Sequence, residues 1–170
     1  MIGDEMSHAF PMLRAGGLFI MLAGLGVALG GVFPPQRKLL LALGGGLATV
    51  VICLSASALS QPFGPPSNAQ IAALVGSIAL ELLLVALVVK RFQAAGERTF
   101  FLAILFVVGV HFLPMALAFG PLCVALGAAA IANASVGLWR MRDAPLTTLW
   151  LMDGAIKILF GGLMYASGGS

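Results

Sequence analysis

The sequence predicts an all-α, polytopic integral membrane protein with six transmembrane helices. Hydrophobic residues make up 61% of the 170 residues and charged residues only 9%, and the mean hydropathy is +1.09. A soluble globular protein has roughly 25% charged residues, so this chain could not cover a water-facing surface. The chain contains six apolar stretches, each long enough to cross a bilayer as a helix of about twenty residues. No polar stretch leaves room for a soluble domain, so residues 1–170 are expected to form a single transmembrane domain.

The first predicted helix covers residues 12–33 and is rich in glycine. Gly26 and Gly30 are four residues apart, a spacing that lets a neighbouring helix approach closely. We interpret this pair as helix packing within one chain, and a homodimer face is the alternative. The helix is expected to end before Pro34, because proline interrupts the hydrogen bonding of a helix interior.

The second and third predicted helices cover residues 39–60 and 69–89. The run Gly44-Gly45-Gly46 in the second helix indicates a bend or a close crossing with another helix. Between the two helices lies an uncharged, proline-rich loop. Ser67 or Asn68 at its end is suited to cap the third helix, because both side chains accept hydrogen bonds from free backbone amides.

The last three predicted helices cover residues 99–119, 122–139 and 145–166. Pro114 lies inside the first of these and removes a backbone donor, so we expect a kink there. The next helix carries Asn133 on a narrow face of small residues. Six segments could also form two inverted three-helix halves, an arrangement common in transporters.

The distribution of positive charge predicts the orientation of the chain. The loops after the first, third and fifth predicted helices hold seven of the nine Lys and Arg residues: Arg37, Lys38, Lys90, Arg91, Arg98, Arg140 and Arg142. By the positive-inside rule these three loops are cytoplasmic. We therefore expect a multi-pass protein of the cell (inner or plasma) membrane with both termini extracytoplasmic.

Four titratable residues lie inside the apolar stretches: Glu81, His111, Asp153 and Lys157. Asp153 and Lys157 are four residues apart, so they share one helix face and can pair. At 1.5 Å per residue, Asp153 and Glu81 lie about 12–14 Å from the cytoplasmic helix ends, and Lys157 and His111 about 18–20 Å. Charges in a bilayer avoid lipid and face protein or water, so we expect these four residues to form one proton- or substrate-binding site.

Four further residues are expected to support this site. Ser77 precedes Glu81 by one turn, and Pro114 frees the carbonyl of Val110 near His111. Asn133 supplies an amide, and we include Trp150 of the last helix in the same supporting set. Structural roles for individual residues are the alternative, with Glu81 bonded to Asn133 or to a hydroxyl.

The charge balance of the four residues predicts proton linkage. Two acids and one lysine leave one excess negative charge while the histidine is neutral, and burial disfavours an isolated charge. A protonated Glu81, a charged His111 facing Glu81, or a bound cation would each balance the site. All three arrangements depend on pH.

Two short stretches resemble known families. His-Phe-Leu-Pro-Met-Ala at 111–116 resembles a motif in small bacterial multi-pass membrane proteins without an assigned activity. Asp153-Gly154-Ala155-Ile156-Lys157 resembles the final helix of microbial rhodopsins, a likeness that implies retinal bound to Lys157 as a Schiff base. The chain departs from that family in having six predicted helices rather than seven and in lacking the acidic-Trp pattern of its third helix. We therefore predict no cofactor.

Three functional classes remain open. The leading hypothesis is a transporter or channel that uses the four residues for proton or cation coupling, with the lipid bilayer and a small ion or solute as its partners. A non-catalytic accessory subunit is the first alternative, and an intramembrane enzyme with His111 as general base is the second. No serine elbow, paired-aspartate motif or metal-ligand spacing indicates catalytic or metal-binding residues. The basic residues lie between apolar helices, which does not favour nucleic-acid binding.

Overall fold

The structure, a computed structural model of the chain, describes residues 9–60 and 64–168. These residues form helices and loops, and six of the helices are long and apolar enough to cross a membrane. The six spans are formed by α2 (Leu13–Val32), α3 (Arg37–Ser60), α4 (Asn68–Phe92), α5 (Glu97–Phe119), α6 (Leu122–Ser135) together with the helical turn that follows it, and α7 (Leu146–Ser167). A short 3-10 turn η1 (Pro34–Gln36) precedes α3, and a π-helical turn η3 (Val136–Arg140) extends α6. The predicted all-α polytopic fold is confirmed.

The ends of the helices follow local sequence signals. Ser67 caps α4 through its side chain, which accepts from the Gln70 amide, and the Gln70 side chain accepts from the Ser67 amide. This reciprocal capping satisfies two backbone donors that the helix itself leaves free. α4 also runs past its predicted end to include Lys90 and Arg91. α5 continues through Pro114 as one helix.

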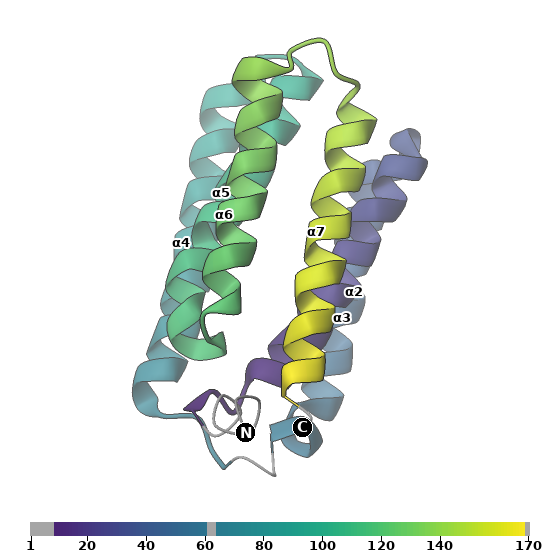
Figure 1. Cartoon of the computed structure of the whole chain (residues 1–170). Helices are drawn as coiled ribbons and strands as arrows, with labels where there is room; N and C mark the ends of the chain where they lie inside the picture. The colour runs from purple at the N-terminus through teal and green to yellow at the C-terminus, as the bar shows by residue number, and fades with distance from the viewer. Residues whose placement is uncertain (1–8, 61–63, 169–170) are drawn as a thin grey trace.

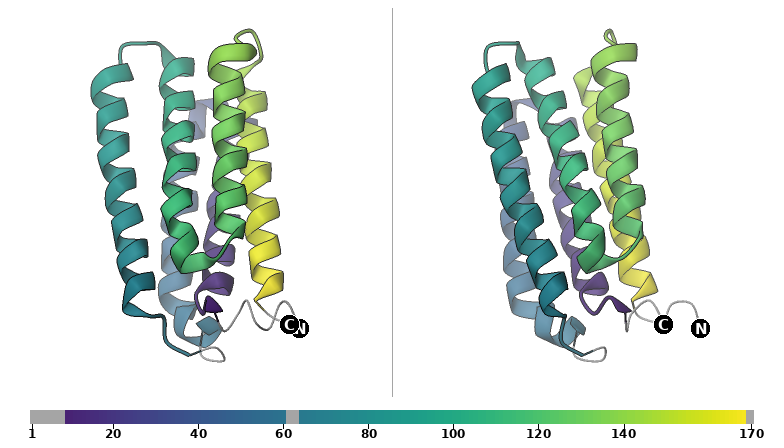
Figure 2. Two further views of the ribbon diagram at one scale, coloured as in Figure 1. Left: turned by 60° about the vertical axis from the view of Figure 1, so that its left-hand side comes forward. Right: turned by 90° about the vertical axis from the view of Figure 1, so that its left-hand side faces the viewer.

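The six helices pack in two layers of three (Figure 1). One layer contains α3, α2 and α7, and the other contains α4, α5 and α6 (Figure 2). The layers meet chiefly where α6 contacts α7, and α2 touches α5 between them. The two layers are therefore not the first and second halves of the sequence, because α4 packs mainly on α5 and α7 packs mainly on α2. The inverted-halves hypothesis stays a prediction.

The basic loops lie together at one end of the bundle. The α2–α3, α4–α5 and α6–α7 connections share this end, whereas α2 begins and α7 ends at the other (Figure 1). We call the first of these the basic end. At the opposite end the described residues include a single basic side chain, Arg14. The alternation of charge along the sequence is thus an asymmetry of the folded molecule.

A seam of glycines holds α2 against α7. Gly17, Gly24 and Gly31 of α2 are seven residues apart, as are Gly154 and Gly161 of α7. A Cβ added at any of the five would lie 2.6–2.7 Å from an atom of the facing helix. Glycine at these positions lets the two backbones come close enough to pack, as small residues do between membrane helices. We call this contact the glycine seam.

The Gly26 and Gly30 pair packs inside the chain. A Cβ at Gly26 would lie 2.6 Å from the Cα of Gly44, so α2 and α3 cross closely at these two glycines. A Cβ at Gly30 would lie 3.0 Å from Nε1 of Trp150 and 3.3 Å from Cγ of Arg37. Both positions match the interpretation of this pair as packing within one chain.

Candidate functional site

Asp153 and Lys157 form a buried ion pair on α7. The Lys157 ammonium donates to Oδ2 of Asp153, one turn earlier on the same helix. The Asp153 side chain is fully buried and that of Lys157 is 5% exposed. Lys157 lies on the glycine seam, where Gly24 leaves room for its Cβ. The pairing predicted from the four-residue spacing is present.

Glu81 and His111 form a second pair, between α4 and α5. Oε2 of Glu81 lies 3.5 Å from Nε2 of His111. At this distance the two side chains form an ion pair when the imidazole is protonated. The Glu81 side chain remains 31% exposed, whereas that of His111 is only 7% exposed. The ring of His111 packs against Phe112, with the two ring centroids 4.3 Å apart. This pair joins two helices, unlike the pair on α7.

The two pairs are electrostatically connected. The Lys157 ammonium interacts through space with both Glu81 and His111. α7 of one layer therefore presents its positive charge to a carboxylate and an imidazole of the other layer. We call Glu81, His111, Asp153 and Lys157 the titratable cluster.

Two polar atoms of the cluster lack a hydrogen-bond partner among the described residues. They are Oδ1 of Asp153 and Nδ1 of His111, and both are buried. A polar backbone group of Val108, one turn earlier on α5, lies near the His111 ring. A buried polar group without a partner costs about 1–3 kcal/mol. A proton, a water molecule or a cation bound at these two atoms would therefore remove the largest unfavourable free energy in the cluster.

The four supporting residues are placed differently from one another. The Ser77 hydroxyl, one turn before Glu81, bonds to the carbonyls of Ala73 and Leu74 at 2.7 and 2.9 Å on its own helix. The Asn133 amide donates to the Leu149 carbonyl at 2.9 Å and thus ties α6 to α7.

The remaining two flank the cluster along their helices. Trp150 is fully buried and lies one turn from Asp153 toward the basic end. Pro114 follows His111 by three residues within α5. In the described residues these supporting side chains frame the cluster and make no hydrogen bond to it.

Arg37 is a functional candidate that the sequence analysis treated only as a topology charge. It lies at the start of α3 but its side chain is 5% exposed. Its guanidinium donates to the Gly30 carbonyl at 3.3 Å and lies 5.1 and 5.6 Å from the ring centroids of Trp150 and Phe101. It also pairs with Glu97 at 3.4 Å. Cation–π contacts of this kind stabilise a desolvated arginine.

Arg37 and the two aromatic rings close the basic end above the titratable cluster. Phe101 and Trp150 meet edge to face at 5.1 Å, which binds α5 to α7 at this level. Both aromatic residues precede the cluster residues of their helices on the side of the basic end. The sequence carries no local signal for this contact, because it depends on which helices are neighbours.

Arg98 positions the segment that leads into α7. Its guanidinium donates to the carbonyls of Gly137 at 3.0 Å and Met141 at 2.7 Å, and also to that of Ala144. These carbonyls belong to η3 and to the loop after it, where regular helical bonding ends. Arg98 thus fixes the entry of the helix that carries Asp153 and Lys157.

The hollows of the described surface lie away from the titratable cluster. One of about 540 Å³ is lined by α4 and α5 near the basic end, and one of about 310 Å³ lies around Arg98 and Arg142. Neither is lined by a residue of the titratable cluster. Among the described residues, no three His, Cys, Asp or Glu side chains gather as metal ligands do.

Comparison with known proteins gives a family but no activity. No curated protein and no solved structure matches the chain. One family model covers nearly the whole sequence, from residue 3 to residue 168. The chain therefore belongs to a family of unknown function, DUF6609.

Proposed function

We propose that the protein is a small membrane transporter or channel in which the titratable cluster couples the movement of a proton or a small cation. The observation that carries the proposal is the Glu81–His111 pair, which joins α4 to α5 within reach of the Lys157 charge. Ionisable residues within membrane helices are rare, and they mark ion pathways and proton relays in pumps and transporters.

The two pairs of the cluster suit different tasks. Asp153 and Lys157 are on one helix and shielded from solvent, so their separation changes little when helices move. Glu81 is partly exposed and faces His111 on another helix. Relative movement of α4 and α5 would change the distance between carboxylate and imidazole and with it the affinity of each for a proton. Glu81 is therefore the proposed exchange site and Asp153–Lys157 the fixed charge pair.

The experiment is flux in reconstituted vesicles. Vesicles containing the purified protein and a pH-sensitive dye are given a proton or alkali-cation gradient. The wild type should show protein-dependent, pH-dependent flux. Glu81→Gln keeps the shape of the side chain but removes its charge, so it should abolish coupling. His111→Ala should reduce it less completely, since the imidazole also packs on Phe112.

Asp143→Asn is the matched control. It makes the same acid-to-amide change at an exposed position of the α6–α7 loop, outside the titratable cluster, so flux should be retained. If the wild type carries no flux and Glu81→Gln is as stable and as fit in cells, the cluster is structural and the protein is an accessory subunit. Turnover of an added substrate that depends on His111 would instead indicate an intramembrane enzyme.

A further inference from the structure

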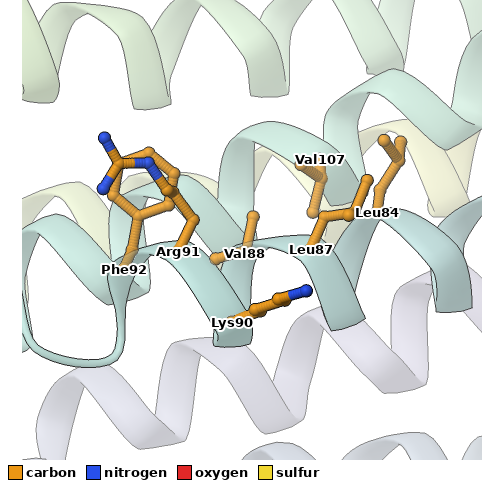
Figure 3. A pocket seen from close by; sticks show the side chains of 7 residues that line it. All are labelled: Leu84, Leu87, Val88, Lys90, Arg91, Phe92 and Val107. Carbon is orange, nitrogen blue, oxygen red and sulfur yellow. The ribbon is translucent and has the colours of Figure 1, made fainter.

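A groove between α4 and α5 combines an apolar floor with two positive charges. Its volume is about 540 Å³, and it lies near the basic end, where α4 ends. Figure 3 shows the side chains that line it: Leu84, Leu87, Val88, Lys90, Arg91, Phe92 and Val107. We call it the basic-rimmed groove.

The polar and apolar parts of the groove are arranged in the same order as the headgroup and acyl chains of a phospholipid. Lys90 and Arg91 are in the last turn of α4, at the end where the basic loops gather. From Arg91 the groove runs along the helix to Leu84, a distance of about 10 Å at 1.5 Å per residue. Its far part is formed by aliphatic side chains such as Leu87 and Val107. Charge therefore lies at headgroup level and hydrocarbon lies deeper in the bilayer.

The two positive side chains on this rim, Lys90 and Arg91, have no ionic or hydrogen-bonding partner among the described residues. Both side chains are exposed and neither makes an ion pair or hydrogen bond there. By contrast, Arg37 is paired with Glu97, and Arg98 is bound to three backbone carbonyls. The second hollow, lined by Arg98 and Arg142, thus has one of its two cations already engaged.

We propose that the basic-rimmed groove binds one anionic phospholipid, with its phosphate on Lys90 and Arg91 and an acyl chain along Leu87 and Leu84. Basic pockets between membrane helices on the cytoplasmic side recognise anionic headgroups in this way. The occupant is a lipid rather than a soluble phosphate, because most of the lining is apolar. The inference is independent of the proposed transport function.

The test is lipid titration of the intact, detergent-purified protein followed by native mass spectrometry. Dioleoylphosphatidylglycerol should bind more tightly than dioleoylphosphatidylcholine. In Lys90→Gln/Arg91→Gln the preference should fall by roughly tenfold or more, since each basic group near an anionic lipid contributes about 1 kcal/mol. The matched control Arg140→Gln/Arg142→Gln removes equal charge from another basic loop and should keep the preference. Equal losses in both double variants would show that net charge alone attracts the lipid and would overturn the site.

Two further measurements keep the test decisive. Leu87→Trp leaves both charges in place but narrows the groove at an exposed position, so it should also weaken phosphatidylglycerol binding. Unchanged binding in this variant would contradict the acyl-chain groove, even if Lys90→Gln/Arg91→Gln failed to fold. Millimolar inorganic phosphate should not displace the lipid, and full displacement would identify a soluble-anion site instead.

Discussion

The Asp153–Lys157 pair is set where an unpaired charge would be most costly. Both side chains are buried in the middle of α7, far from either end of the helix. Removing one partner of a buried ion pair leaves the other uncompensated and typically costs about 3–5 kcal/mol. Removing both by neutral residues of similar size costs much less. The pair is thus a constraint on sequence as much as a source of stability.

This reasoning gives a prediction for single and double substitutions. Asp153→Asn and Lys157→Met should each lower thermal stability in detergent, by an amount equivalent to about 3 kcal/mol. The double variant should be more stable than either single variant, because neither charge is then left alone. Thermal unfolding of the four proteins would check this. Additive losses would mean that the two charges have separate partners.

The residues of the site differ in how well the sequence alone could predict them. Asp153 and Lys157 lie on one helix, and helix geometry fixes their contact. The Glu81–His111 contact depends on which helices are neighbours, so their shared position in the central part of the bilayer made it an expectation only. Arg37 was missed because a loop arginine in a membrane protein normally sets topology, and nothing local shows that its side chain turns inward.

At the scale of elements, the glycine seam determines how closely α2 and α7 pack within their layer. Gly24 faces Lys157, and a Cβ added at Gly24 would lie 2.7 Å from the Cβ of Lys157. Real side chains do not tolerate such a contact, so any larger residue must push α2 away from α7. The seam therefore positions the cluster lysine through the backbone of another helix.

Gly24→Ala should destabilise the protein by about 1–3 kcal/mol, the usual cost of overpacking. Gly162→Ala is the matched control: it makes the same change in α7, but an added Cβ would meet nothing within 4 Å. The control should be neutral or slightly stabilising, because alanine favours a helix more than glycine does. Thermal unfolding in detergent distinguishes the two. Equal effects would contradict a seam that is tight at Gly24.

The elements themselves were largely predictable. When η3 is counted with α6, each helix begins and ends within three residues of its predicted bounds, because hydropathy, proline and charge mark the membrane boundaries directly. The neighbours of each helix were not predictable. The pair Gly26 and Gly30 attracted attention by its four-residue spacing, but the contact between α2 and α7 uses glycines seven residues apart.

At the scale of the whole molecule, the basic end should face the cytoplasm. Seven of the nine basic residues lie in its three loops or in the helix ends that flank them, and short basic loops are retained on the cytoplasmic side during insertion. A fluorescent reporter that matures only in the cytoplasm should stay dark when fused after Ser170. The same reporter fused to a chain ending at Ala94, in the α4–α5 loop, should fluoresce. The reverse pattern would invert the orientation and move the basic-rimmed groove to the outer leaflet.

The glycine seam also gives the molecule an order of assembly. Its two strips of glycine, in α2 and α7, are separated by more than a hundred residues of sequence. Because the ribosome makes the chain from its N-terminal side, α2 is translated before α7, and its glycine face has no partner until α7 follows. α7 also carries Asp153 and Lys157. The titratable cluster is therefore complete only after α7 has been made, and a chain that ends before α7 lacks two of the four residues that the proposed activity requires.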